Sequence, residues 1–168
     1  MTIQAGDRLP DGTLTECTEF DPATNCPLNP QSLAVQDLIK GKKIVIFAVP
    51  GAFTPTCSIK HLPGYVKHYE AFKAKGVDEI WCLSVNDAFV MAAWGRDQHV
   101  NGKVRLLADG SALYTTQLGL SQDLTAKGLG VRSLRYALIV EDGVVKHVAV
   151  EAPSKFEVSN AEAILAAL

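Results

Sequence analysis

The chain has 168 residues and a net charge of −2, and 48% of its residues are hydrophobic against 20% charged. These proportions exclude a disordered chain and suit one compact domain over residues 1–168. Lysine and arginine are scattered along the chain without a basic run, so we expect no nucleic acid partner. The longest apolar run, 44–50, is too short to span a bilayer, so we expect no membrane partner either.

The start of the chain, MTIQAGDRLP, lacks the positive stretch and apolar segment of a secretory signal. The four cysteines, at 17, 26, 57 and 82, form neither a C-x-x-C pair nor a zinc-like pattern with histidine. No phosphate-binding or dinucleotide-binding glycine motif is complete. We therefore expect a cytoplasmic protein with reduced thiols, no metal and no cofactor.

Strands and helices are predicted to alternate along most of the chain. In order, we expect a strand at 13–20, a loop at 21–32, a short helix at 35–40, a strand at 44–49, a helix at 55–75, a strand at 79–85, a helix at 88–98, a strand at 104–108, a helix at 111–118, a loop at 119–134, strands at 135–140 and 144–150, and a helix at 159–168. This order predicts a three-layer α/β fold with a mixed central sheet flanked by helices.

Local signals mark the ends and irregularities of these helices. Pro63-Gly64 should kink the helix at 55–75. Asn86-Asp87 can cap the helix that follows them, and Ser159 with Glu162 has the spacing of a capping box for the last helix.

The segment between the strand at 44–49 and the next helix carries the most specific signal. Thr54 suits the N-cap of that helix and Pro55 its first position, so Cys57 falls at the third. Unpaired N–H groups and the positive end of the helix dipole favour the thiolate there, and the thiolate is the nucleophilic form. The alternative is a cysteine that simply packs in the core, as most free cysteines do.

The same segment, VPGAFTPTCSIKHLPGYV, resembles the active-site loop of the type II, atypical two-cysteine peroxiredoxins. The similarity continues in CLSVNDAFVMAAWGRD, KVRLLADGSA, GLGVRSLRYALIV and AVEAPSKFEVSNAEAIL, and so covers nearly the whole chain. It implies a thioredoxin-like fold and a thiol peroxidase that reduces hydrogen peroxide and organic hydroperoxides without a cofactor.

The resemblance also assigns residues. It places the peroxidatic cysteine at Cys57, the family's proline and threonine at Pro50 and Thr54, and its active-site arginine at Arg135. An arginine there can hold the thiolate ionised and orient the peroxide oxygens. Arg132 lies nearby, and its contribution stays open.

The route that regenerates the thiol also stays open. The sulfenic acid formed on Cys57 needs a second thiol. Cys82 matches a cysteine of the plant relatives and is a possible resolving residue, but it is expected mid-strand and can equally be a packed cysteine. The other candidates are external thiols, namely glutathione with glutaredoxin, or thioredoxin. Cys17 and Cys26 match no role in the family.

Two further functions compete with the peroxidase. His61 follows Cys57 by four residues, which is the spacing of a Cys/His pair in a hydrolase or thiol transferase, although a structural role is favoured. A redox sensor or holdase that oxidises Cys57 without turnover is the third reading. The resemblance further implies a homodimer, to which Phe89 and Trp94 could contribute if they are not core residues.

Overall fold

Strand β5 (Lys43–Ala48) carries the apolar run noted in the sequence, and its side chains alternate between two cores. Val45 contributes to one buried cluster, whereas Ile44 and Ile46 contribute to the other. This is the two-residue period of a strand, and burial on both faces requires cover on both sides. The computed structural model, which describes residues 1–168, shows that cover.

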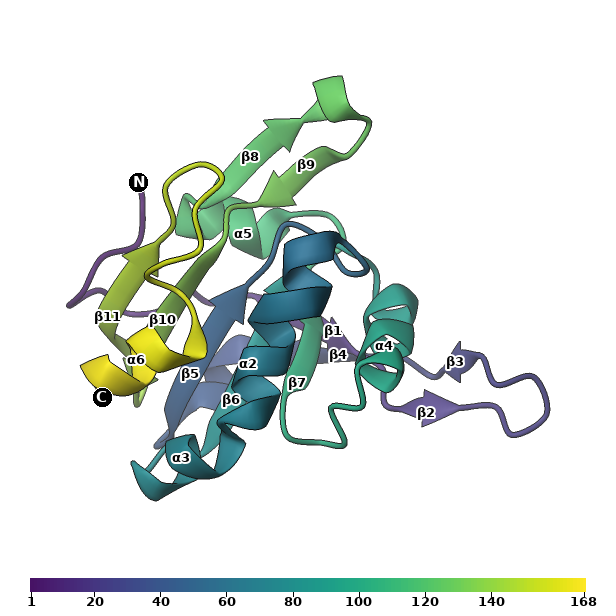
Figure 1. Ribbon diagram of the computed structural model, residues 1–168, viewed down its shortest axis with the longest axis horizontal. Coiled ribbons are helices and arrows are strands. Elements are labelled where there is room, and N and C mark those ends of the chain that lie inside the picture. The colour runs from purple at the N-terminus through teal and green to yellow at the C-terminus, as the bar shows by residue number, and fades with distance from the viewer.

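The central sheet has seven strands. Besides β5 they are β1 (Thr13–Glu16), β4 (Gln31–Ala34), β6 (Glu79–Ser84), β7 (Arg105–Ala108), β10 (Tyr136–Glu141) and β11 (Val144–Val150). Their order across the sheet is β11-β10-β5-β6-β7-β1-β4 (Figure 1). The contacts of β6 with β5 and with β7 are parallel, and the others are antiparallel, so the predicted mixed sheet is confirmed.

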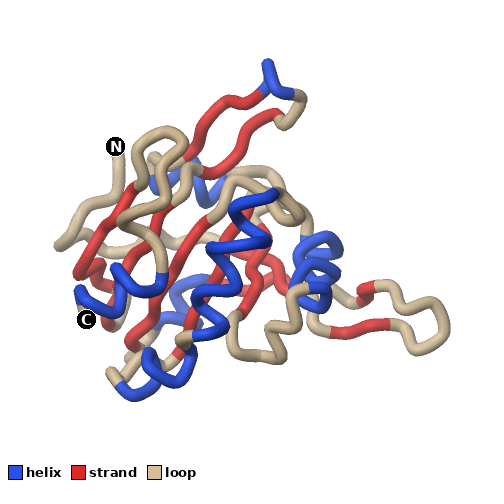
Figure 2. The backbone as a smooth tube through the Cα atoms, in the orientation of Figure 1, coloured by secondary structure: helices blue, strands red, loops and turns tan.

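Helices cover both faces of the sheet (Figures 1 and 2). One face packs against α2 (Leu62–Lys67), α3 (Tyr69–Ala74), α4 (Ala88–Asp97) and α6 (Ala161–Ala167), and the opposite face against α1 (Val35–Ile39) and α5 (Leu113–Leu118). The predicted three-layer arrangement is therefore confirmed. The core on the α2 side is the larger, with 24 buried residues against 18, and it contains Cys57.

The helix predicted at 55–75 is interrupted in a different way from the expected kink. Its first turns form a π-helical segment (Cys57–His61), in which the N–H of Leu62 bonds to the carbonyl of Cys57 five residues back. Pro63 follows and has no N–H to continue the regular ladder, which accounts for the irregularity before it. A second break, at His68, separates α2 from α3.

Two predicted segments are wrong in detail. The expected loop at 119–134 contains a hairpin of β8 (Ser121–Leu124) and β9 (Gly130–Ser133) joined by a 3-10 turn (Thr125–Lys127). Its strands are mostly polar and only partly buried, so they lack the apolar alternation that predicts a strand. Figure 1 shows this hairpin rising from the body of the protein.

The strand expected at 13–20 ends early, and the following loop is partly ordered into strands. β1 stops at Glu16, after which β2 (Glu19–Phe20) and β3 (Pro27–Leu28) pair as a two-stranded arm that projects from the sheet (Figure 1). The loop expected at 21–32 therefore includes β3 and the start of β4. Pairs only two residues long carry too little sequence pattern to be recognised.

The cap of the last helix is also displaced by one residue. Asn160, and not Ser159, precedes α6, and its side chain accepts the N–H of Ala163 at 2.8 Å. The hydroxyl of Ser159 bonds instead to Glu151, eight residues earlier in the sequence. Asp87 caps α4 as predicted. No helix in the structure combines the length and apolar composition needed to cross a membrane.

The difference in burial between Ile80 and Ile59 predicts that their replacement by alanine has different effects on the free energy of unfolding. Ile80→Ala should lower the free energy of unfolding by about 2–5 kcal/mol because it leaves a cavity in the core. Ile59→Ala makes the same chemical change at a side chain that is 70% exposed, and should alter stability by less than about 0.5 kcal/mol. Urea unfolding of both variants measures the difference, and equal losses would contradict the burial pattern.

Candidate active site

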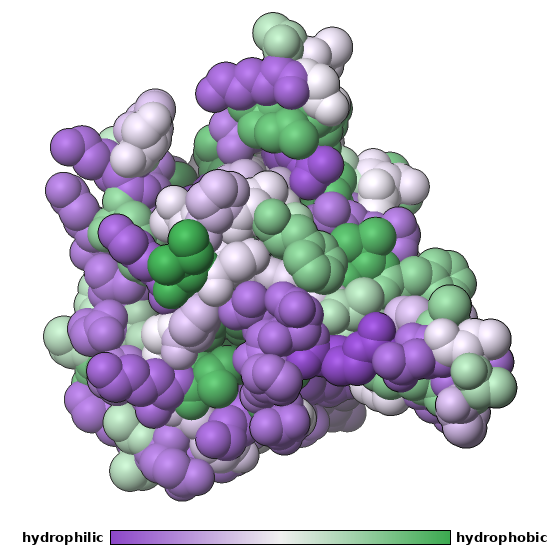
Figure 3. Space-filling view, turned by 45° about the vertical axis from the view of Figure 1, so that its right-hand side comes forward, coloured by the Kyte–Doolittle hydropathy of each residue, from purple (hydrophilic) through white to green (hydrophobic).

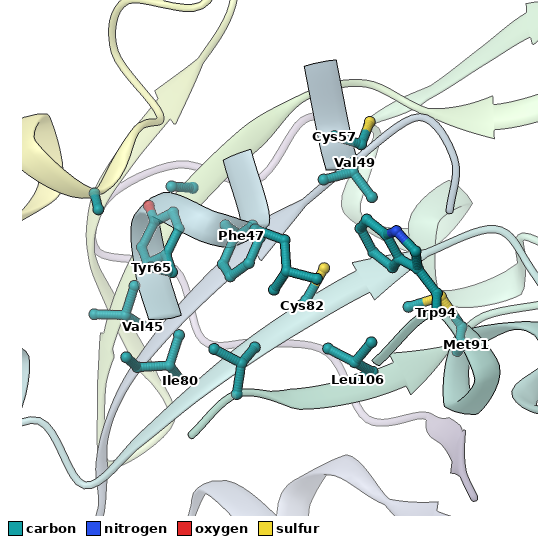
Figure 4. Close-up of a cluster of buried hydrophobic side chains, with 14 of the residues drawn as sticks. Val45, Phe47, Val49, Cys57, Tyr65, Ile80, Cys82, Met91, Trp94 and Leu106 are labelled. Atoms are coloured by element: carbon teal, nitrogen blue, oxygen red, sulfur yellow. The ribbon is translucent and has the colours of Figure 1, made fainter. Parts of the chain in front are cut away.

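The loop after β5 leads directly into the helical turn that holds Cys57. Pro55 is the first helical residue, and the carbonyl of Thr54 accepts the N–H of Ser58 at 3.0 Å. Cys57 is therefore third in the helix, as the sequence predicted. Its side chain is fully buried (0% exposed), and Figure 4 shows its sulfur at the edge of the apolar cluster, directed away from the other labelled side chains.

A guanidinium group lies against this sulfur. Nη2 of Arg135 donates to Sγ of Cys57 at 3.2 Å, and Nη1 of the same side chain donates to Nδ1 of His61 at 2.9 Å. Arg135 directly precedes β10, the strand beside β5, and Tyr136 pairs with Ala48 at the end of β5. Arg135 therefore lies next to the loop that leads from β5 into the helix. The sulfur thus has a positively charged hydrogen-bond donor in direct contact.

His61 is a neutral residue of this cluster. Burial and the charge of Arg135 lower its pKa from 6.5 to about 3. Because arginine can only donate, Nδ1 of His61 is the acceptor, and Nε2–H donates to the carbonyl of Ser159 at 3.0 Å. Both ring nitrogens therefore bond to groups other than Cys57, and the geometry does not form the Cys/His pair of a hydrolase.

Pro50 and Thr54 lie on the loop that approaches Cys57. The hydroxyl of Thr54 donates to the carbonyl of Gly51 at 2.7 Å, which closes the loop before the helix begins. Arg132 donates to the carbonyl of Pro50 at 3.2 Å, so it braces the loop, and its recorded bonds do not include Cys57. A Cβ at Gly51 would lie 2.6 Å from the terminal Nη1 of Arg132, so a larger residue there would displace this guanidinium.

The remaining cysteines differ in their surroundings. Cys82 sits mid-strand in β6, fully buried, and burial raises the pKa of its thiol well above the ordinary value. Figure 4 shows it deeper in the cluster than Cys57. Cys17 is buried and donates to the carbonyl of Leu28 at 3.1 Å, whereas Cys26 is exposed on the β2–β3 arm. All four thiols are free.

Sequence reasoning missed part of the surroundings of Arg135. The carbonyl of Ser159 accepts from His61 and, at 2.7 Å, from the hydroxyl of Tyr65. Ser159 is in turn bonded to the carboxylate of Glu151. His61 and Ser159 are 98 positions apart in the sequence, so no local motif links them. The only sequence signal near Ser159 was the resemblance of segment 149–165 to the family.

A cleft of about 730 Å³ opens beside Arg135. Pro50 and Phe156 line it together with Lys60 and Lys155, and neither lysine takes part in an ion pair. Cys57 lies just behind this surface, in contact with Arg135. A second cavity, of about 600 Å³, lies beside α4 and includes Cys17 but none of the predicted active-site residues. No three metal-ligating side chains come close enough to hold an ion.

Comparison with known proteins agrees with this geometry. The family model named Redoxin matches residues 4–165. Peroxiredoxin-2B of Arabidopsis thaliana is 51% identical over 166 residues, which cover 99% of this chain and 98% of the relative. The crystal structure of reduced Prx3 of Vibrio vulnificus in complex with hydrogen peroxide is 51% identical, has a TM-score of 0.89 and covers 99% of both chains.

A crystal structure from Burkholderia cenocepacia is 60% identical, with a TM-score of 0.94 and coverage of 100% of this chain and 99% of the other. It is described as a thioredoxin reductase, unlike the peroxiredoxin names of the relatives above. The family match agrees with those relatives. The chain therefore belongs to the peroxiredoxins of the redoxin family and is a thiol-dependent peroxidase with a thioredoxin-like fold.

Proposed function

We propose that Cys57 is the residue that attacks the peroxide, and the contact of 3.2 Å between its sulfur and Arg135 is the observation that carries this assignment. The thiolate attacks one peroxide oxygen, and the O–O bond breaks as the S–O bond forms. The attacked oxygen stays on sulfur as the sulfenic acid of Cys57. The other oxygen leaves, takes up a proton and becomes water or an alcohol.

Charge develops on the leaving oxygen during this step and needs stabilisation. Arg135 and the free N–H groups of the first helical turn are the donors available for it. Thr54 is assigned to orient the peroxide with its hydroxyl oxygen, which keeps lone pairs free while its proton bonds to Gly51. Pro50, on the wall of the cleft, is assigned to keep water from the sulfur.

Hydrogen peroxide and organic hydroperoxides are the proposed substrates. The Vibrio vulnificus relative was crystallised with hydrogen peroxide, which supports the smaller one. The cleft of about 730 Å³, lined in part by Leu134 and Phe156, offers room and apolar contacts for an alkyl group. Because the sulfur itself is fully buried, the peroxide end must enter past Arg135.

An external thiol is the proposed reductant of the sulfenic acid, which gives the protein a role in redox homeostasis. Cys82 is fully buried and its raised pKa keeps it as the neutral thiol, which is a poor nucleophile. The unpaired Lys60 and Lys155 beside the cleft suit the carboxylates of glutathione or an acidic surface of glutaredoxin or thioredoxin.

A homodimer in the cytoplasm completes the proposal. Phe89 and Leu113 are exposed and line one shallow cavity near the carboxyl ends of the parallel strands, which favours self-association there, whereas Trp94 is fully buried in the core. Figure 3 shows a face on which hydrophobic surface lies among polar residues. Four free thiols suit a reducing compartment, although relatives include chloroplastic and mitochondrial proteins.

Loss of the attacking thiol should abolish turnover. In an assay that couples hydrogen peroxide or cumene hydroperoxide to NADPH through glutathione and glutaredoxin, or through thioredoxin, Cys57→Ser should be inactive because serine is not ionised at neutral pH. Cys26→Ser removes an exposed thiol and should keep full activity. Stoichiometric oxidation of the unmodified protein without turnover would favour a sensor, and ester cleavage lost in His61→Ala would favour a hydrolase.

Removal of the guanidinium should slow peroxide attack. Arg135→Gln should reduce the rate of peroxide consumption about a hundredfold, the usual effect of losing one donor to a developing negative charge. Its Cys57 should also react more slowly with iodoacetamide at pH 6–7. Arg8→Gln, an exposed arginine near the opposite end of β10, is the control and should leave both rates unchanged. Unchanged rates in Arg135→Gln would refute its assigned role.

Cys82 should be dispensable when the reductant is external. Cys82→Ser should keep most of its turnover with glutathione and glutaredoxin, because the buried thiol cannot reach a sulfenic acid without local unfolding. Steady-state rates of the two proteins, each corrected for its folded fraction by circular dichroism, measure this. Complete loss with that reductant would identify Cys82 as an obligatory resolving residue.

A further inference from the structure

Glu151, directly after β11, is a buried carboxylate surrounded by neutral donors. Glu151 is 8% exposed, and no lysine, arginine or histidine forms an ion pair with it. The backbone N–H groups of Glu157, Val158 and Ser159 donate to its oxygens at 2.8–3.0 Å. The hydroxyl of Ser159 donates to it as well, at 2.7 Å.

These donors stabilise the charged form of the carboxylate. Burial alone would raise the pKa of Glu151, but the hydrogen bonds from Glu157, Ser159 and Val158 outweigh that effect and hold the pKa below its usual value. A charged acceptor that gathers successive N–H groups fixes the path of the backbone that supplies them. Glu151 therefore determines where the carbonyl of Ser159 points.

The carbonyl of Ser159 is the next link toward the sulfur. It accepts from Nε2–H of His61 at 3.0 Å and from the hydroxyl of Tyr65 at 2.7 Å. The first of these bonds fixes the proton of His61 on Nε2, which leaves Nδ1 free to accept from Arg135. A continuous chain of hydrogen bonds therefore runs from Glu151 through Ser159, His61 and Arg135 to Cys57. The donor and the acceptor of each bond in it are defined.

We propose that Glu151 is a positioning residue for the peroxidase reaction: through Ser159 and His61 it holds the Arg135 guanidinium in its place against the Cys57 sulfur. The inference rests on the proposed roles of Cys57 and Arg135. Glu151 lines the cleft, but its carboxylate oxygens bond to the segment 157–159 and not to the sulfur. It acts because a guanidinium that is displaced by a fraction of an ångström loses its alignment with the reacting atoms.

The charge, as well as the shape, of the side chain matters in this arrangement. Glu151→Gln keeps nearly the same volume and can place its amide oxygen where Oε2 accepts from Val158 and Ser159, but it removes the charge and puts an N–H donor where Oε1 accepts from Glu157. The bonds from Ser159 to a neutral amide oxygen are weaker than those to a carboxylate, so the segment that carries Ser159 is held less firmly. His61 loses its fixed acceptor, and the contact between Arg135 and the sulfur loosens.

The test compares Glu151→Gln with Glu162→Gln, a carboxylate on α6 whose recorded side-chain partner is His68. Glu151→Gln should lower kcat/KM for hydrogen peroxide about tenfold or more and leave KM for the reductant unchanged. Its Cys57 should react more slowly with iodoacetamide at pH 6 but not at pH 9. In histidine-labelled protein, the Nε2–H proton signal of His61 should shift or disappear. Glu162→Gln should change none of these.

Ser159→Ala covers the case in which Glu151→Gln fails to fold. It removes one hydrogen bond to the carboxylate and keeps the backbone carbonyl, so we expect a fall of about threefold in kcat/KM and a smaller shift of the His61 signal. A folded Glu151→Gln, or in its absence Ser159→Ala, with normal rates and an unchanged His61 signal would overturn the proposal. Activity in Cys57→Ser would instead overturn the proposed function itself, which keeps the two failures distinct.

Discussion

The guanidinium of Arg135 bonds at the same time to the sulfur of Cys57 and to the ring of His61, two groups on one π-helical turn. A planar fork held at two points has its orientation fixed as well as its position. Because Arg135 directly precedes β10 and the other two residues lie on the helix, the pair of bonds also ties the start of the helix to the end of that strand. The proposed peroxide chemistry and the hydrogen-bond network through His61 and Ser159 both meet at this contact.

The neutrality of His61 directs the charge of Arg135 toward the sulfur. An imidazolium at that place would repel the guanidinium and leave it without an acceptor on that side. Burial keeps the ring uncharged, and the carbonyl of Ser159 selects the tautomer whose Nδ1 is an acceptor. The positive charge in contact with the sulfur therefore comes from a single residue, and the aromatic ring of Phe156 lies beside it.

Much of the fold and the centre of the site were predictable from sequence because their signals are local. The strand at 44–49 is marked by an unbroken apolar run, and Thr54 and Pro55 lie next to Cys57 in the chain. Arg135 could be assigned only through resemblance, since nothing in its own neighbourhood distinguishes it from a surface arginine. Glu151 and the polar hairpin within 119–134 were missed, because a single carboxylate bonded to backbone N–H groups and two mostly polar strands leave no apolar periodicity in the sequence.

The bond between Trp94 and Ser58 gives the molecule a built-in optical probe. The indole Nε1–H of this buried tryptophan donates to the hydroxyl of the residue that follows Cys57, at 3.0 Å. Oxidation of the sulfur adds volume to a fully packed turn, and any rearrangement there stretches or breaks this bond. Under the proposed role of Cys57, the emission of Trp94 should therefore change on oxidation, whereas that of Trp81, the other buried tryptophan, lies in the opposite core and provides an internal reference.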